Sequence, residues 1–97
     1  MTYTKEDIAK IVTRRTGVPF RVVKKFVDII LQTIADMIVD MKDEDRIELR
    51  NFGVFKVWYY FPESKRNPQN NNQITLTARR KVRWKPSKVI KKKLLEL

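Results

Sequence analysis

The periodicity of the apolar residues changes once along the chain, and this change restricts the fold more than any other feature. From Val22 to Met41, apolar residues recur every three or four positions, which predicts a helix of about twenty residues. After the acidic residues 43–45, apolar and polar residues alternate, which predicts β-strands. Helical residues therefore precede strand residues along the chain, and we predict an α+β fold.

The first part of the chain, residues 1–45, is predicted to hold two helices. Thr4 and Asp7 have the spacing of a capping box, and Gly17 is expected to end the first helix. Pro19 is expected to start the second helix. The apolar stripe of that helix is too broad for two helices to cover. It fits either the centre of a monomer core or a core shared by a dimer, and we favour the dimer.

The net charge of +11 arises from 22 Lys and Arg against 11 Asp and Glu, and it is unevenly distributed. Residues 1–45 hold 8 basic and 8 acidic residues, whereas residues 46–97 hold 14 and 3. The chain has no His and no Cys, which excludes a thiolate nucleophile, a Cys/His zinc site and the commonest general base. The net charge therefore predicts binding to a polyanion, and we favour a non-enzymatic protein without metal or cofactor over the enzyme considered below.

One predicted strand carries four basic residues on the same face. They stand at alternate positions: Arg79, Lys81, Arg83 and Lys85. Val82 and Trp84 face the other way, and Arg80 is an exception among them. Like charges about 7 Å apart in a row weaken a free sheet. A solvated outer strand explains one or two of these charges but explains four poorly, so we predict contacts with phosphates.

Residues 58–80 are predicted to form a long two-stranded arm, with a polar turn near its tip. A β-ribbon of this kind can enter a DNA groove, and an apolar tip residue such as Pro68 can wedge between base pairs. From the residues alone, an ordinary turn proline is slightly favoured. After the arm, Pro86 and Ser87 are expected to open a last helix, whose lysines extend the positive surface.

Two motifs resemble the bacterial histone-like HU and integration host factor family. The first is Ile47–Val57, which contains the predicted hairpin turn Asn51-Phe52-Gly53, where Asn and Gly both tolerate positive φ. The second is Lys65-Arg66-Asn67-Pro68-Gln69. The family patterns are G-F-G-x-F and G-R-N-P-x-T-G. The predicted order of elements resembles the family over essentially all 97 residues, and residues 77–86 resemble the integration host factor branch more than HU.

The resemblance implies one DNA-binding domain, residues 1–97, with two N-terminal helices, a three-stranded antiparallel sheet, a long β-ribbon arm and a short C-terminal helix. Residues 1–45 would be the helical dimerisation part of an intertwined dimer, and residues 46–97 the sheet and C-terminal helix, with the arm at about 58–80. The partner would be a second copy or a paralogous subunit. The dimer would embrace the minor groove of double-stranded DNA and bend it in the nucleoid of the cytoplasm.

The candidate residues form three groups under this resemblance. In the arm, Pro68 would be the intercalating wedge, and the DNA-binding residues beside it would be Lys65, Arg66, Asn67, Gln69, Arg79, Arg80 and Lys81. In the body, the DNA-binding residues would be Arg46, Lys56, Arg83, Lys85, Lys88 and Lys91. The dimer core would contain Phe26, Ile30, Ile34, Phe52 and Phe55.

The ascending strand of the arm departs from the family pattern. Many relatives carry Arg where this chain has Tyr60 and Glu63, so the groove contacts of that strand are not transferred to this chain. The basic descending strand is expected to compensate. Near the tip, Lys65 stands in place of a Gly, and residues 70 and 71 replace the usual Thr-Gly.

Two other functions remain open on composition. A basic chain of this size could be an RNA-binding structural protein, although it lacks the aromatic and Gly signature of a base-stacking sheet. One cluster of acidic residues could bind Mg²⁺ in an enzyme. Its members are Asp40, Asp43, Glu44 and Asp45. A solvated loop is the favoured interpretation of this cluster. Residues 1–10 lack the apolar stretch of a secretory signal and the Arg-rich composition of a transit peptide, so no targeting signal is expected. Charged residues interrupt the apolar stretch from Val22 to Met41, so no membrane span is expected either.

Overall fold

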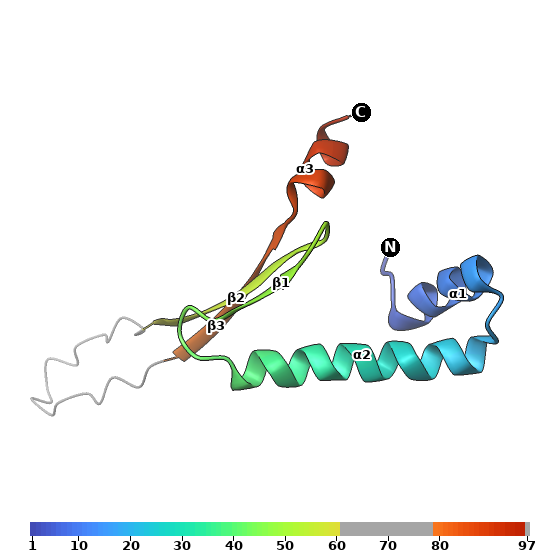
Figure 1. Cartoon of the computed structure of the whole chain (residues 1–97), viewed down its shortest axis with the longest axis horizontal. Coiled ribbons are helices and arrows are strands. Elements are labelled where there is room, and N and C mark those ends of the chain that lie inside the picture. The colour runs from blue at the N-terminus through green and yellow to red at the C-terminus, as the bar shows by residue number, and fades with distance from the viewer. Residues whose placement is uncertain (61–78, 97) are drawn as a thin grey trace, which may run out of the picture. The chain divides into compact units, whose positions relative to one another are not determined.

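The computed structural model describes residues 1–60 and 79–96 (Figure 1). The chain divides into two compact units, Met1–Val39 and Asp40–Leu97, and each is described by itself. The predicted tip of the arm, including Pro68, lies outside the described residues. That the whole chain acts as one domain stays a prediction.

Helix α1, Lys5–Thr16, begins and ends as the sequence predicts. The backbone N–H of Thr4 donates to the Asp7 carboxylate over 2.7 Å, and the Thr4 hydroxyl lies 3.2 Å from the same oxygen. These hydrogen bonds, the backbone one first, lower the pKa of the Asp7 carboxyl below its ordinary value. Gly17 follows the helix at a φ of 76°, and its N–H bonds to the Thr13 carbonyl. The predicted capping box and glycine terminator are both confirmed.

Helix α2, Phe20–Asp40, begins directly after Pro19, whose carbonyl accepts hydrogen bonds from the next helical turn. Its N-terminal half packs on α1, and the buried residues there are Ala9, Val23 and Val27. Two ion pairs on the surface link the helices, Lys5 to Asp28 at 3.0 Å and Lys24 to Glu6 at 3.3 Å. Within residues 1–60 and 79–96, no helix is long and apolar enough to cross a membrane.

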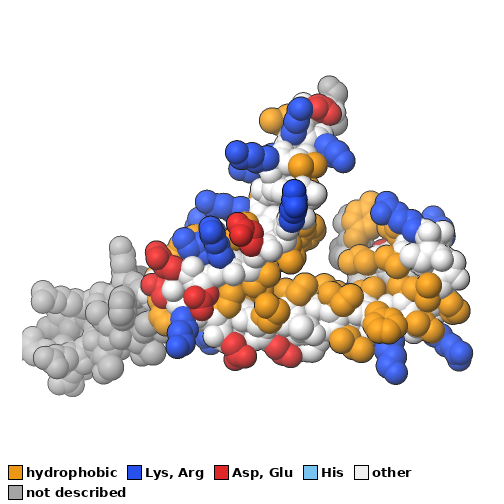
Figure 2. All heavy atoms as spheres, viewed as in Figure 1, with side chains coloured by type: hydrophobic (Ala, Val, Ile, Leu, Met, Phe, Trp, Pro, Cys, Tyr) orange, Lys and Arg blue, Asp and Glu red, His pale blue; other side chains and the backbone are white. Residues whose placement is uncertain are grey.

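Much of the apolar side of α2 is exposed in the single chain. Phe26 is 59% exposed and Ile30 is 55% exposed, although both belong to the predicted dimer core. Ile34 is half-buried. Figure 2 shows apolar side chains along the surface of this helix. The two helices therefore bury only part of the stripe, as its breadth predicts.

The second unit is a three-stranded antiparallel sheet followed by a helix, as predicted. Its elements are β1 (Arg46–Leu49), β2 (Gly53–Tyr60), β3 (Arg79–Pro86) and α3 (Lys88–Leu95). The central strand is β2, which pairs with both neighbours. The β2–β3 register runs from Gly53 opposite Pro86 to Tyr60 opposite Arg79. The unit buries Met41, Ile47 and Val57, of which Val57 is the most enclosed.

The turn between β1 and β2 confirms one half of its prediction and corrects the other. Asn51 has a φ of 65°, the left-handed conformation expected there. Gly53 does not have a positive φ, so that expectation is wrong. A Cβ at Gly53 would instead collide with the carbonyl oxygen of Lys85 and the indole of Trp84. Glycine is needed at this position because β3 passes too close for any side chain.

The acidic turn before β1 has a structural role in the second unit. The Asp43 carboxylate accepts a hydrogen bond from the backbone N–H of Tyr59 over 2.8 Å, and the Asp45 carboxylate accepts one from Lys42 over 2.8 Å. The backbone N–H of Glu44 donates to Val57 over 3.0 Å. Within the described part of the chain, no cluster of three acidic side chains could hold a metal ion. The acids thus satisfy backbone donors where the chain enters the sheet.

Candidate nucleic-acid interface

The sheet has one apolar face and one basic face. The strand pairing places apolar side chains on the first face, and they are Ile47, Leu49, Phe55, Val57, Val82 and Trp84. Phe52, in the turn, packs its ring 5.4 Å from that of Trp84 and 6.4 Å from that of Phe55. Because successive side chains of a strand point to opposite faces, the remaining strand residues form the other face. The predicted alternation of β3 is therefore confirmed over its described residues.

The basic face draws cations from all three strands. Its basic residues are Arg46, Lys56, Arg79, Lys81, Arg83 and Lys85. Lys56 lies directly opposite both Arg46 on β1 and Arg83 on β3, so three cations form a row across the sheet. Neighbouring strands are about 4.8 Å apart, a distance at which like charges repel. The carboxylate of Glu48 lies on the same face, 4.0 Å from Arg46.

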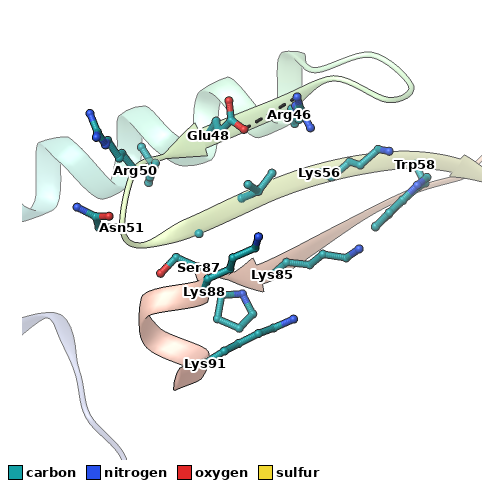
Figure 3. Close-up of a pocket in the computed structure, with 14 residues that line it drawn as sticks. Arg46, Glu48, Arg50, Asn51, Lys56, Trp58, Lys85, Ser87, Lys88 and Lys91 are labelled. Atoms are coloured by element: carbon teal, nitrogen blue, oxygen red, sulfur yellow. Dashed lines mark ion pairs between the residues drawn. The ribbon is translucent and has the colours of Figure 1, made fainter. Parts of the chain in front are cut away.

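A groove beside this face brings most of the predicted body residues together (Figure 3). It has a volume of about 520 Å³ and lies between the β1–β2 hairpin, the end of β3 and the start of α3. Five of the six predicted body residues line it: Arg46, Lys56, Lys85, Lys88 and Lys91. Arg83 is not among the lining residues, but it stands opposite Lys56 on the basic face.

The start of α3 is fixed to the hairpin by backbone contacts. The Ser87 N–H donates to the carbonyl of Phe52 over 2.9 Å, and the Ser87 hydroxyl accepts from the N–H of Ile90 over 3.3 Å. This N-cap confirms the predicted helix start. It places Lys88 and Lys91, one turn apart, along one side of the groove. The lysines of α3 therefore extend the basic face, as the sequence predicts.

Three cations of the basic face contact aromatic rings. The Lys56 Nζ lies 5.4 Å from the centre of the Trp58 ring, and the Arg83 Cζ lies 5.5 Å from the same ring. The Lys81 Nζ lies 4.6 Å from the centre of the Tyr60 ring. These distances are those of cation–π interactions. The sequence analysis did not assign Trp58 and Tyr60 to the basic face. Because Lys56, Trp58 and Tyr60 stand at alternate positions of one strand, the two-residue period could have placed them there.

The other predicted site residues are distributed as follows. Arg79 and Lys81 lie on the basic face, whereas Arg80 lies on the opposite face, across from Tyr59. The tip residues fall outside the described residues, and they are Lys65, Arg66, Asn67, Pro68 and Gln69. Arg50 and Asn51 line the groove without having been predicted to do so. They belong to the turn, where alternation assigns no face.

The arrangement is suited to binding a phosphate backbone. Six cations with one carboxylate form a continuous face over three strands, and a groove edged by further lysines adjoins it. Such a face attracts a polyanion and releases the counterions that surround it. The α+β fold and this face together define a nucleic-acid-binding protein.

Comparison with known proteins identifies the family. The family model described as "Bacterial DNA-binding protein" matches residues 3–95. Integration host factor subunit beta of Aeromonas hydrophila subsp. hydrophila is 30% identical over 92 residues, covering 94% of this chain and 95% of the relative. Integration host factor subunit alpha of Bdellovibrio bacteriovorus is 30% identical over 88 residues, covering 91% and 77%. In an Anabaena HU–DNA cocrystal structure, the matching chain has 20% identity and a TM-score of 0.73, covering 96% and 98%.

The chain belongs to the bacterial DNA-binding protein family, to which the resemblance in the sequence had pointed. It is an architectural DNA-binding protein and not an enzyme. The structural match confirms the predicted fold.

Proposed function

We propose that this chain acts as a dimer that binds double-stranded DNA on its basic sheet face and bends it. The observation that carries the proposal is the row formed by Arg46, Lys56 and Arg83 across three strands. Three adjacent like charges weaken an isolated sheet, and a bound phosphate backbone removes that cost. The proposed location is the bacterial nucleoid, within the cytoplasm, where the DNA lies.

The exposed apolar side of α2 supports the dimer. Side chains such as Phe26 and Ile30 are more than half exposed in the single chain, and Phe52, whose ring packs near those of the apolar sheet face, is 47% exposed. Apolar surface on this scale is typical of an obligate protein interface. The proposed cover is a second copy of the chain or a paralogous subunit. Relatives named as alpha and as beta subunits both match. Measuring whether the purified chain dimerises without another subunit distinguishes a homodimer from a heterodimer.

The arm completes the proposal. Strands β2 and β3 are paired up to Tyr60 and Arg79, so the chain leaves and re-enters the sheet at neighbouring positions. We place Pro68 as the intercalating residue of the segment between them, with Arg66 and Asn67 beside it in the minor groove and Lys65 and Gln69 next to them. Selectivity would then come from how easily a sequence kinks.

The first test measures binding and assembly with the purified chain. We expect sedimentation to show a dimer, and the logarithm of the affinity for duplex DNA to fall steeply with the logarithm of the salt concentration. An affinity that does not change between low and moderate salt would contradict phosphate binding. Tighter binding to duplex RNA than to duplex DNA would favour an RNA-binding protein instead.

The second test concerns the proposed wedge. We expect Pro68→Ala to lower the bend angle, measured by ring closure of short duplexes, more than it lowers the affinity, because phosphate contacts provide most of the affinity. Pro19→Ala, which changes a proline before α2, is the matched control and should bend DNA like the unchanged chain. Equal bending by the Pro68 variant would remove Pro68 from the mechanism.

A further inference from the structure

The basic face contains two aromatic side chains whose presence DNA binding by cations alone does not explain. Trp58 and Tyr60 follow Lys56 at alternate positions of β2, so the three share a face. The register places Trp58 opposite Lys81 and Tyr60 opposite Arg79.

Each ring contacts the cation on the diagonal across the strand pair. Tyr60 contacts Lys81, which stands opposite Trp58, and Trp58 contacts Arg83, which stands opposite Lys56. Both contacts therefore connect a ring on β2 to the β3 residue two positions further along that strand. Trp58 also contacts Lys56 on its own strand. The repeated geometry indicates an ordered array rather than chance proximity.

These three cations have no carboxylate partner within the described residues of the sheet. Among the described residues, the ion pair found on the basic face joins Arg46 to Glu48 and involves none of them. An aromatic ring attracts a cation through its quadrupole but leaves the charge in place. A carboxylate, in contrast, would neutralise the charge and would have to be displaced by an incoming phosphate. Rings thus hold the long side chains of Lys56, Lys81 and Arg83 while keeping them available to an anion.

We propose that Trp58 and Tyr60 are positioning residues for DNA, which order these cations before the phosphates arrive. The inference rests on the proposed function, because it assumes that the basic face binds DNA. Ordering a flexible side chain in advance removes part of the entropy cost of binding. Two of the three ordered cations come from β3 and one from β2, and both rings come from β2.

The competing role for Trp58 is stacking on an unpaired base. Sheets that bind single strands use exposed rings as stacking surfaces. Here two cations, one from each strand, lie within 5.5 Å of the centre of the one Trp58 ring and compete with a base for it. The geometry therefore favours phosphates as the target of the array.

A double-mutant cycle in the full chain tests the proposal. We expect Trp58→Leu to reduce the affinity for duplex DNA by about tenfold and the salt slope by about 1–2, because each lost phosphate contact lowers that slope by about 0.9. In a background carrying Lys56→Gln and Arg83→Gln, Trp58→Leu should have no further effect. Equal losses in both backgrounds would overturn the proposal, since both a structural role and base stacking predict them.

Two control variants, a second cycle and the unchanged chain separate the possible failures. Trp58→Phe keeps a ring and should restore most of the affinity, whereas Tyr59→Leu removes a ring from the opposite face and should leave the salt slope unchanged. If Trp58→Leu does not fold by circular dichroism, the independent cycle of Tyr60→Leu with Lys81→Gln decides by the same criterion. Absence of duplex binding by the unchanged chain would defeat the proposed function itself, which is a distinct outcome.

Discussion

The two units of the chain expose surfaces of opposite kinds. In the helical unit, charged side chains pair with one another, as Lys5 does with Asp28, while large apolar side chains such as Phe26 remain exposed. In the sheet unit, one face of the strands is cationic, and one ion pair, between Arg46 and Glu48, is found among its described residues. The first surface needs an apolar cover and the second needs an anion. Under the proposed function, the difference assigns a different partner to each unit, a protein chain to the helical unit and DNA to the sheet unit.

The largest effect is expected from placing a charge on the apolar side of α2. Ile30→Asp should raise the dissociation constant of the dimer by about a thousandfold, because an unpaired charge in an interface costs about 3–5 kcal/mol. Sedimentation velocity over a range of concentrations measures this. Lys25→Asp adds an acid on the polar side of the same helix and should leave the dimer intact. Equal dissociation of both variants would show that charge alone, and not the apolar surface, controls assembly.

The two glycines of the chain, one in each unit, provide the next comparison. At Gly53 a Cβ would collide with backbone and indole atoms of β3, so Gly53→Ala should lower the free energy of unfolding by about 3 kcal/mol. At Gly17 the space is open but φ is 76°, so Gly17→Ala should cost only about 1 kcal/mol through backbone strain. Urea denaturation measures both. A larger loss at Gly17 than at Gly53 would contradict the close approach of β3.

The charges of the basic face are expected to affect binding and not assembly. Replacing Arg83 and Lys85 together by Gln should lower the affinity for duplex DNA by about thirtyfold at 0.15 M salt, if each cation neutralises one phosphate. The salt slope should fall by about 1.8. Lys24→Gln removes a cation that is paired with Glu6 in the helical unit and should change neither quantity much. If Lys24→Gln lowered the affinity about as much as each substitution on the basic face does, net charge, and not this face, would determine the affinity.

Much of this molecule could be predicted from its sequence because its local signals agree with one another. The capping box at Thr4, the terminator at Gly17 and the alternation of β3 each depend on neighbouring residues, and each is found in the structure. The basic row on β3 followed from the same alternation. Local rules were sufficient there because a strand with a two-residue period has only two faces.

What the sequence did not reveal depends on pairing between distant segments. The need for Gly53 arises from β3, more than thirty residues away, so the turn chemistry suggested a positive φ instead. The contact of Trp58 with Arg83 requires the register of β2 against β3, which no local pattern specifies. The role of Asp43 likewise depends on Tyr59 in a different element. The roles of the tip residues stay predictions, because the tip lies outside the described residues.

The smallest effect concerns an acid whose charge supports structure rather than binding. The Asp7 carboxylate accepts from the N–H of Thr4 over 2.7 Å, and this hydrogen bond lowers the pKa of Asp7 in the folded chain below its ordinary value of 3.8. A carboxyl group whose pKa is lower in the folded state than in the unfolded state contributes its full stabilisation of the fold at pH values above its unfolded-state pKa. That contribution is lost as the pH falls through the folded-state pKa. The melting temperature of Asp7→Asn should therefore lie slightly below that of the unchanged chain at neutral pH. The two should converge when the pH falls well below 3.8. Thermal melts of both chains across this range measure the difference. If the difference between the two melting temperatures stays constant down to the lowest pH, the asparagine disturbs α1 by its shape. The carboxylate charge would then contribute nothing to the stability of the helical unit.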